Sequence, residues 1–428
     1  MTLVWESGIT LQHPDNNDPL LDLNTQPSLD LQFATSKTLD DAVSGTNLIT
    51  FSRASSGTYV DSDGLIKTAV TDAPRFDHDP VTGESLGLLI EESRTNLVEY
   101  SEQLGNWGTP STAIGNTTTS PSGGTAVGVD STTSLTITVT DPSSITFSCY
   151  VKAGSSDYVY LRTVNWGTLV RVWFNLADGS TGSVSPVSSN ITNVTSTDAG
   201  DGWYRISFQL DSTGDNVGNL QITATDADLN INQVGYVFAW GIQVEEGSFP
   251  TSYIPTTTSA VTRAADVVEI TGTNFSSWFN PSEGTIYSKA IGSPQTTTTT
   301  NTGSGYPYIY SIDSSLSNRL IGSRSAGVNN GSWAAYAQPP ASFSYVTSSN
   351  FNTQQVSHKV GGSYTSSTYV AFADGVVGSS ITPGTNNSAL LRLSIGSGID
   401  GGFWGGHIAR LAYYPYRLTD TTLQEITS

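Results

Sequence analysis

This sequence has little cysteine, little positive charge and no long apolar run, and each shortage narrows what the chain can be. Cys149 is the single cysteine among 428 residues, so an intrachain disulfide is excluded and oxidising secretion is not required. Lysine and arginine total 17 against 37 aspartates and glutamates, which gives a net charge of -20. Because nucleic acids and anionic membranes attract basic patches, this balance argues against both as partners.

Targeting and helical signals are also scarce. The first residues, MTLVWESGITLQ, have neither a basic start nor a long apolar core. We therefore expect no signal peptide, no membrane insertion and synthesis in the cytoplasm. One helical signal stands out near the C-terminus. Thr421 or Thr422, with Gln424 or Glu425 three residues later, forms a capping box and predicts one short terminal helix.

Short segments of alternating apolar and polar residues, separated by Gly, Asn, Asp and Pro, fill most of the chain. TFSCYVKAG, LVRVWFNLA, GWYRISFQL and YVFAWGIQVEE are clear examples. Their alternation predicts that Cys149, Trp173, Trp203 and Trp240 are core side chains. Many such strands with turn residues between them predict an all-β fold of tandem antiparallel β-sandwiches, including a jelly roll, with very little helix.

Changes in composition predict four regions. Residues 1–27 are polar and interrupted by proline, as in an arm for attachment, and residues 28–95 form a β-rich region. Residues 96–258 are predicted to be the jelly roll, and residues 259–428 a second sandwich. GLLIEESRTNLV and WGIQVEEGSFPTSYIP share a layout, in which an apolar strand is followed by two glutamates and a departing segment. We therefore expect modules joined end to end, each closed by an acidic strand terminus.

Three groups of segments resemble known families. ITFSRASSGTYVDSDGLIKTAVTDAPRFDHDPVTGESLGLLIEESRTNL resembles a segment of structural proteins of tailed bacteriophages, marine and cyanobacterial phages included, that is frequent in predicted tail fibres. FSCYVKAG, GDGWYRISF and WGIQVEEGSFPTSYIPT resemble a carbohydrate-binding-type jelly roll. TYVAFADG, LLRLSIGS and GGHIARLAYYPYRLTDTTLQEI resemble the closing strands and terminal helix of concanavalin A-like or laminin-G-like sandwiches.

These resemblances imply a virion protein that is made in the bacterial cytoplasm and contacts other virion proteins through its N-terminal region. They also imply a homo-oligomer, and a trimer by analogy with the way phage fibres are generally built. The first function implied is a tail-fibre or spike adhesin that binds host-surface polysaccharide without cleaving it. The alternative is a capsid-decoration or other purely structural virion protein, and the third is a glycan depolymerase.

The residues argue against catalysis. Glycan hydrolysis needs two carboxyl groups that face each other across the scissile bond, and carboxylates on one face of a strand are two or four residues apart. The pairs Glu91/Glu92 and Glu245/Glu246 are adjacent, so their members point to opposite faces. We interpret them as polar strand ends, although carboxylates from distant strands could still converge. The four histidines are isolated and the cysteine is single, which argues against a zinc site. We therefore expect no enzyme and no required cofactor.

Two aspartate pairs are candidate ligands for Ca²⁺, Asp77 with Asp79 and Asp226 with Asp228. Calcium prefers oxygen ligands, and closely spaced aspartates supply them. The first pair departs from the EF-hand loop, because the glycine that the loop requires falls one place late, at Gly83. The alternative for both pairs is an ordinary aspartate-rich turn.

Aromatic residues in turns are the candidates for glycan binding, because an aromatic face packs against the apolar face of a pyranose ring. The candidates are Trp333 and Tyr336 in NNGSWAAYAQPP, Trp404 between the glycines of GIDGGFWGGH, and Tyr306 and Tyr308 after a Thr/Asn/Gly-rich loop. The alternative for each is packing at the edge of a core or against a neighbouring subunit.

Overall fold

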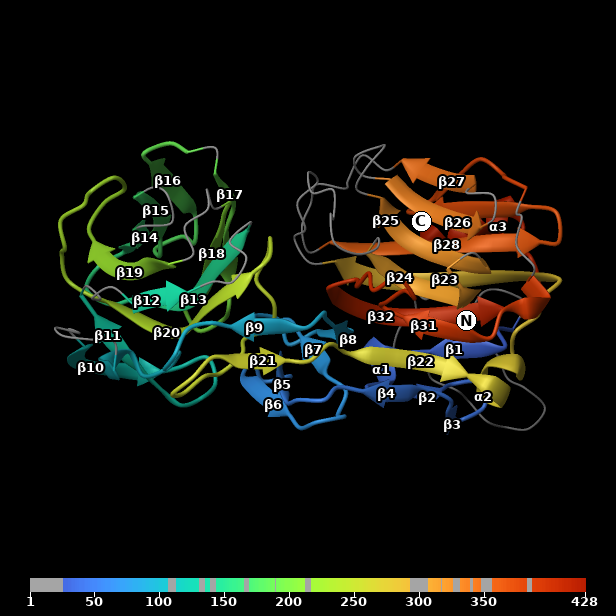
Figure 1. Cartoon of the computed structure of the whole chain (residues 1–428), viewed down its shortest axis with the longest axis horizontal. Coiled ribbons are helices and arrows are strands. Elements are labelled where there is room, and N and C mark those ends of the chain that lie inside the picture. Colours follow the sequence, from blue (N-terminus) through green and yellow to red (C-terminus); the bar gives the residue numbers. More distant parts are fainter. Residues whose placement is uncertain are drawn as a thin grey trace, which may run out of the picture.

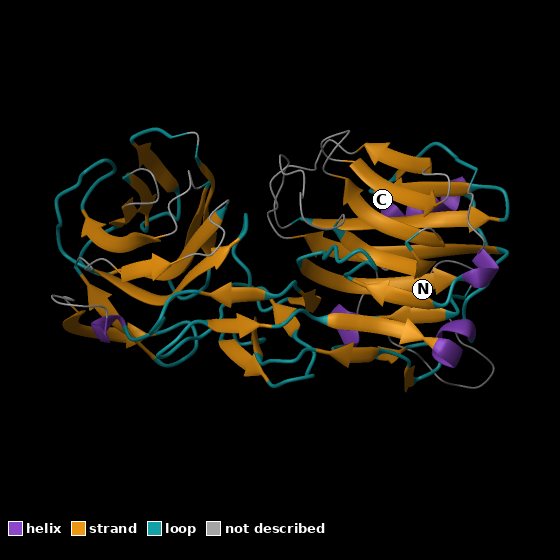
Figure 2. Ribbon diagram, in the orientation of Figure 1, coloured by secondary structure: helices purple, strands orange, loops and turns teal. Residues whose placement is uncertain are grey.

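A computed structural model describes the backbone of most of the chain. The described residues are 26–106, 113–130, 135–138, 144–164, 169–188, 190–211, 217–292, 307–316, 318–325, 332–338, 342–347, 356–382 and 387–428. Within them the chain is an all-β protein of two lobes joined by a narrower junction, which confirms the predicted fold class (Figures 1 and 2). Almost all of the predicted arm, residues 1–27, lies outside the described residues. None of the described helices is long and apolar enough to cross a membrane.

One lobe, here called the jelly-roll unit (residues 97–256), packs two antiparallel sheets face to face. In the described residues the larger sheet has the order β10 (Ala113–Thr119), β11 (Thr125–Val129), β20 (Val237–Glu246), β13 (Ile145–Ala153), β18 (Trp203–Leu210) and β17 (Ile191–Asp198). The smaller sheet has the order β12 (Leu135–Thr138), β19 (Val217–Thr225), β14 (Tyr158–Val164), β15 (Val170–Asn175) and β16 (Thr181–Ser185). A 3₁₀ turn, η2 (Leu104–Asn106), precedes both sheets.

The inward side chains of these two sheets form one core, as the period-two alternation requires. Cys149 is buried there, and burial raises the pKa of its thiol to about 12. Its predicted role as a small buried hydrophobe is therefore confirmed. Trp173, Trp203 and Trp240 are each 1% exposed, so the prediction that they are buried is also confirmed. They lie outside the core between the sheets, because Trp203 and Trp240 pack in a second cluster with Ile66 and Tyr253.

The other lobe, here called the sandwich unit, contains the two largest sheets. Its ten-stranded sheet contains β3 (Thr46–Asn47), β2 (Asp40–Asp41), β1 (Leu29–Leu31), β32 (Gly406–Tyr414), β23 (Glu283–Gly292), β28 (Ser357–Thr365), β29 (Tyr369–Ala373) and β30 (Val376–Val377), with β8 (Ser85–Ile90) on β32 and β7 (Phe76–His78) on β8. Its seven-stranded sheet has the order β27 (Ser342–Thr347), β26 (Ser332–Gln338), β25 (Asn318–Ser325), β24 (Tyr308–Ser315), β31 (Arg392–Ile395), β22 (Val267–Thr271) and β4 (Thr50–Ser52).

The N-terminal region is part of this sandwich, which differs from the separate region predicted for residues 28–95. Strands β1 and β8 both pair with β32, and β4 pairs with β22 in the opposite sheet. Leu31, Leu88 and Ile90 are fully buried in one core with Ile408 and Leu411. The sandwich unit therefore consists of residues 28–95 and 261–428, and the jelly-roll unit is inserted between these two parts. End-to-end joining of modules is wrong at this point.

The junction between the units is a pair of short antiparallel ribbons. Strand β9 (Arg94–Asn96), which leaves the sandwich unit, pairs with β21 (Val261–Arg263), which returns to it. The hairpin of β5 (Gly57–Val60) and β6 (Ile66–Ala69) lies beside them (Figure 1). The outgoing and returning chains are thus held together where the insertion begins and ends.

Helices are few and short among the described residues: α1 (Phe33–Ser36), α2 (Gly272–Ser276), α3 (Asp420–Thr427) and the 3₁₀ turn η3 (Asn387–Ala389). The predicted terminal helix is confirmed as α3, which buries Leu423 and Ile426. Its N-cap is Thr419, whose hydroxyl accepts a hydrogen bond from the Thr422 amide. The predicted cap at Thr421 or Thr422 is therefore wrong, because the chain enters the helix two or three residues earlier, at Thr419.

Candidate functional site

The predicted aromatic glycan site does not form at two of its five residues. Trp404 is 2% exposed, and its indole nitrogen donates to the carbonyl oxygens of Ile291 and His407 at 3.2 and 3.3 Å. Tyr308 is fully buried, and its hydroxyl donates to Asp400 at 2.6 Å. The expectation that these rings project from loops is wrong, because their polar atoms find partners inside the sandwich unit and their rings fill its interior.

The other three aromatic candidates are two residues of a strand and one residue that the structure does not describe. Trp333 and Tyr336 lie in strand β26, paired with β25 and β27, where a loop was predicted. The run of small residues in SWAAYAQ carries no strong strand signal, and long-range pairing decides its conformation. Tyr306 lies outside the described residues.

The aspartate pairs are occupied by local hydrogen bonds. Asp79 accepts the amides of Val81 and Thr82, as in an Asx turn, and Asp228 accepts the amide and hydroxyl of Ser183. Asp226 accepts from the Asn230 side chain. In the described part of the chain no three His, Cys, Asp or Glu side chains lie close enough together to hold a metal ion. Neither Asp77/Asp79 nor Asp226/Asp228 is therefore joined by a third such side chain within the described residues, and the Ca²⁺ assignment stays a prediction.

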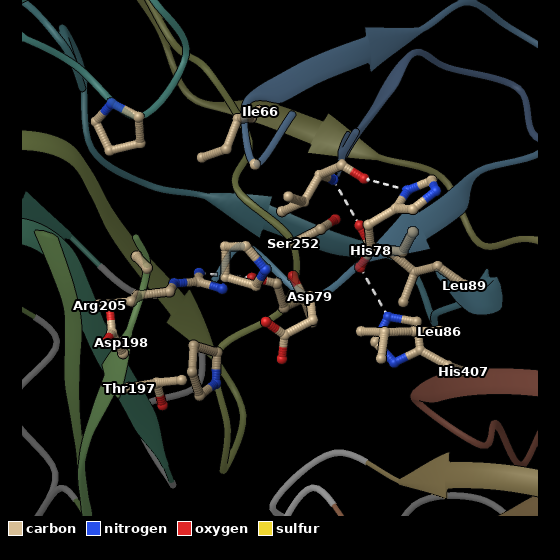
Figure 3. A pocket seen from close by; sticks show the side chains of 18 of the residues that line it. Ile66, His78, Asp79, Leu86, Leu89, Thr197, Asp198, Arg205, Ser252 and His407 are labelled. Carbon is tan, nitrogen blue, oxygen red and sulfur yellow. Dashed lines mark hydrogen bonds and ion pairs between the residues drawn. The ribbon is translucent and has the colours of Figure 1, made fainter. Parts of the chain in front are cut away.

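A cavity of about 270 Å³ lies where the two units meet, here called the junction cavity (Figure 3). The jelly-roll unit contributes β17, β18 and the segment 250–252, and the sandwich unit contributes β7, β8, the turn between them and the ends of β23 and β32. The two units touch directly at Pro80. A Cβ on Gly200 of the jelly-roll unit would lie 2.7 Å from the Pro80 carbonyl oxygen, so only glycine allows this approach.

One wall of the junction cavity carries two histidines from opposite ends of the chain. His407 Nε2 and Asp77 Oδ2 are 2.7 Å apart, and Asp77 also accepts the Val60 amide. His78 is 6% exposed, and its Nδ1 lies 3.1 Å from the Val60 carbonyl oxygen. A carbonyl oxygen only accepts, so Nδ1 carries the proton and Nε2 of a neutral His78 presents a lone pair. In the described structure this buried Nε2 has no partner.

Arg205 of β18 and Asp79, which come from different units, both line the junction cavity (Figure 3). The Arg205 guanidinium donates to the Thr251 carbonyl oxygen at 2.6 Å and lies 5.4 Å from the Tyr150 ring centroid. Its buried Nε has no partner among the described residues. The junction cavity is therefore lined by both polar and apolar side chains. The apolar ones include Ile66, Leu86, Leu89, Pro80, Pro121 and Pro250.

Glu91, which lines the junction cavity, belongs to a buried cluster of charged residues. Glu91 pairs with Arg75 at 2.8 Å and Arg263 at 3.5 Å, and Asp266 pairs with Arg75 at 2.5 Å and Arg53 at 3.0 Å. Burial by itself would raise the pKa of Glu91. The charges of Arg263 and Arg75 and two hydrogen bonds from Ser252 outweigh burial and hold this pKa well below its ordinary value.

The ionised state of the Glu91 carboxylate limits the reactions that the junction cavity could catalyse. A carboxylate held ionised by two arginines cannot act as a general acid, which hydrolysis of a glycosidic bond requires. Asp77 is engaged by His407 and the Val60 amide. The interpretation of Glu91 and Glu245 as polar strand ends needs correction in one respect, because both are buried, at 4% and 0% exposed. The arrangement is suited to holding a polar molecule.

Sequence reasoning missed His78, Arg205 and His407 as lining residues. The histidines are isolated in sequence, and the hydrogen bond between His407 and Asp77 joins residues 330 positions apart. Arg205 looks like an ordinary outward residue of a half-buried strand. Only Asp77 and Asp79, predicted for another purpose, pointed to this place. The histidine between two aspartates in DHD, residues 77–79, was the one local signal of this cavity in the sequence.

No model of a protein family and no characterised protein sequence matches the chain. Among solved structures it is similar to the CBM40 domain of Ruminococcus gnavus IT-sialidase bound to α2,6 sialyllactose, with 14% identity, 34% of this chain and 84% of that chain covered, and a TM-score of 0.28. It is also similar to domain 4 of AbnA, a GH43 extracellular arabinanase from Geobacillus stearothermophilus, in complex with arabinotriose, with 12% identity, coverage of 43% and 84%, and a TM-score of 0.27.

A third similar structure is Trypanosoma rangeli sialidase in complex with the inhibitor DANA, with 11% identity, coverage of 63% of this chain and 51% of that chain, and a TM-score of 0.27. Similarities this low carry no argument about ligand or reaction. The sheet order by itself shows an all-β protein of two sandwich units.

Proposed function

We propose that this chain is a non-enzymatic carbohydrate-binding protein of a bacteriophage virion, of the tail-fibre or spike type, and that its junction cavity holds a neutral sugar. The observation that supports binding is the mixture of groups in that one cavity. The Asp79 carboxylate accepts hydrogen bonds, Arg205 donates them, and His78 and His407 are further polar lining residues. A sugar hydroxyl does both, and the C–H face of a pyranose ring suits an apolar wall such as Leu86.

The size and charge of the cavity narrow the ligand. At about 270 Å³ it falls just below the roughly 300–1,000 Å³ typical of sites for drug-sized ligands, so it suits one or two sugar rings. Asp79 and Asp198 line it together with Arg205. Because a carboxylated sugar would meet these two acids, a neutral sugar is the better fit.

The virion role rests on the sequence resemblance of residues 49–97 and is supported by the way those residues are used. They form much of the junction, where Arg53, Arg75 and Glu91 are buried in one charged cluster. The same cluster favours a second candidate, a structural virion protein. Ser252 of the jelly-roll unit donates two hydrogen bonds to Glu91 of this cluster, and a buried, hydrogen-bonded connection between two sandwiches suits a protein that carries load or packs into a shell.

A glycan array probed with the full chain tests the binding proposal, followed by calorimetric titration of the best neutral oligosaccharide. Leu86→Trp fills the junction cavity without removing a hydrogen bond, and we expect it to weaken binding at least tenfold. Leu316→Trp is the matched control, because Leu316 is 55% exposed on the sandwich unit and does not line the cavity. We expect that variant to bind like the wild type.

Two outcomes would overturn the binding proposal: no neutral glycan is retained, or Leu86→Trp binds as tightly as the wild type. Release of reducing ends from the bound glycan would show an enzyme instead. The virion role is tested separately by locating the chain in purified phage particles. Density at the tail tip supports an adhesin, density over the capsid shell supports the structural candidate, and absence from particles contradicts both.

A further inference from the structure

Two arginines face each other on the outer surface of the jelly-roll unit. Arg162 of β14 and Arg171 of β15 are directly paired in the antiparallel register. Their neighbours Val159, Leu161, Val170 and Val172 point to the opposite side, into the core between the sheets. The two guanidinium groups therefore share the face that no second sheet covers, where both side chains are half-buried.

No carboxylate neutralises this pair within the described structure. Neither arginine takes part in an ion pair, although the chain has 37 acidic residues against 17 basic ones. Asp228, on the loop that covers the neighbouring part of this face, is bound to Ser183. The Nε atoms of Arg162 and Arg171 are both buried and have no partner among the described residues. Like charges directly opposite each other on a sheet destabilise it, so the pair has a cost that a bound anion would offset.

The pair is the centre of a polar row that crosses four strands. Gln221 of β19 lies opposite Arg162 and accepts from its Nη1 at 2.6 Å, and Ser185 of β16 lies opposite Arg171. With strands about 4.8 Å apart, three spacings give the row a length of about 14 Å. The Arg171 guanidinium lies 5.9 Å from the centroid of the Tyr160 ring, which holds it in place.

A loop closes one side of this row. The Tyr160 hydroxyl donates to the Ile231 carbonyl oxygen at 3.3 Å, and the Trp173 indole nitrogen donates to the Asn230 carbonyl oxygen at 3.1 Å. Tyr160 and Trp173 are thereby covered, at 6% and 1% exposed, while the arginine row beside them is not. The row of polar residues thus lies beside a raised loop, which contains Asn230 and Ile231, and not on a flat surface.

We propose that the row Gln221–Arg162–Arg171–Ser185 binds the acidic groups, carboxylate or sulfate, of an anionic polysaccharide. The planar guanidinium fork matches a carboxylate or sulfate with two parallel hydrogen bonds, and two forks side by side suit a chain that carries repeated acidic groups. The amide and hydroxyl at the two ends of the row suit sugar hydroxyls. This second site does not depend on the neutral-sugar site of the proposed function, from which it differs in unit, charge and ligand.

Calorimetric titration of the full chain with three probes tests this site. The probes are oligogalacturonate, which carries carboxylates, dextran sulfate, which carries sulfates, and unmodified dextran as the neutral reference. We expect one or both acidic probes to bind, dextran not to compete, and affinity to fall as salt rises. We expect Arg162→Gln with Arg171→Gln to lose at least tenfold in affinity, since each charge-assisted contact is worth about that factor. The acidic probe that binds identifies the group.

The controls separate charge, geometry and folding. Arg417→Gln removes one positive charge, from a pair with Asp420 elsewhere on the protein, and we expect it to bind the acidic probe normally. Arg171→Lys keeps the positive charge but lacks the planar guanidinium group. We expect it to bind the acidic probe with intermediate affinity and to have an unchanged circular dichroism spectrum. It therefore tests the site even if the double variant does not fold. Normal binding by both Arg171→Lys and the double variant, or no binding of either acidic polysaccharide, would overturn the proposal. Leu86→Trp should leave this binding intact.

Discussion

Glu91 accepts hydrogen bonds from both the backbone amide and the hydroxyl of Ser252, each at 2.6 Å, although 161 residues separate them. The matching glutamate of the jelly-roll unit, Glu245, accepts the amide of the preceding residue, Thr251, at 3.0 Å. The two acidic strand ends that look alike in sequence thus hold the same crossing segment from two sides. This segment leads from the insertion back to the sandwich unit, so the two glutamates fix how the units are joined.

Replacing Glu91 should therefore weaken the whole junction. We expect Glu91→Gln to lower the free energy of unfolding by about 3–5 kcal/mol, because Arg75 and Arg263 lose a buried counter-charge. Urea denaturation followed by tryptophan fluorescence measures this. Glu92→Gln is the matched control, because Glu92 pairs with Arg94 in a partly exposed position, for which we expect about 1 kcal/mol or less. Equal losses in the two variants would show that the buried cluster has no special role.

The stability of the protein should fall in acid for the same reason. The pKa of Glu91 is lowered in the folded state, so the unfolded chain binds the proton more tightly than the folded one. The contribution of Glu91 is therefore fully present above the ordinary pKa of a glutamate, about 4.5, and is lost as the pH falls below it. We expect the melting temperature of the wild type to drop more steeply between about pH 5 and pH 3 than that of Glu91→Gln. Parallel curves would assign the acid sensitivity to other carboxyl groups.

The pairing of β8 with β32 should depend on Gly87. Its φ is +96°, and a Cβ there would lie 2.3 Å from the Ile408 carbonyl oxygen. We expect Gly87→Ala to destabilise the sandwich unit by clearly more than the roughly 1–2 kcal/mol of left-handed strain alone. Gly45→Ala supplies that reference, because Gly45 has a φ of +67° and no atom within 4 Å of the added Cβ. Thermal melts of both variants give the comparison, and similar melting temperatures would refute close contact between β8 and β32.

The inserted arrangement of the units predicts which fragments fold. Residues 259–428 alone lack β1, β4 and β8 and would expose Ile408 and Leu411, so we expect an insoluble or unfolded fragment. Asn96 and Val261 are partners in the β9–β21 ribbon. A chain that joins these two residues by a two-residue turn, with the jelly-roll unit removed, should fold as the sandwich unit. Circular dichroism and size-exclusion chromatography of both fragments decide this, and a stable 259–428 fragment would contradict it.

Local pattern was enough to predict the type of element and much of the core. The apolar and aromatic residues of TFSCYVKAG and GWYRISFQL identified β13, β18 and the buried Cys149 and Trp203. The alternation did not show that both faces of these strands are buried, with Cys149 between the sheets and Trp203 in a second cluster. The same reasoning failed for Trp404. The glycines on both sides of Trp404 predicted a ring exposed in a turn. In the folded chain the ring is buried, and its indole nitrogen donates to two carbonyl oxygens.

The sequence by itself determined that this protein is all-β, where most of its strands lie and that its surface is acidic, because each of these properties depends on residues a few positions apart or on composition alone. Only the tertiary structure decided that residues 28–95 complete a sandwich begun after residue 261, that His78, Asp79 and Arg205 line one cavity, and that Arg162 faces Arg171. These relationships depend on the register between strands far apart in the chain. The pairing of distant strands is determined by which sheet faces become buried in the folded protein, and a local pattern of residues does not specify it.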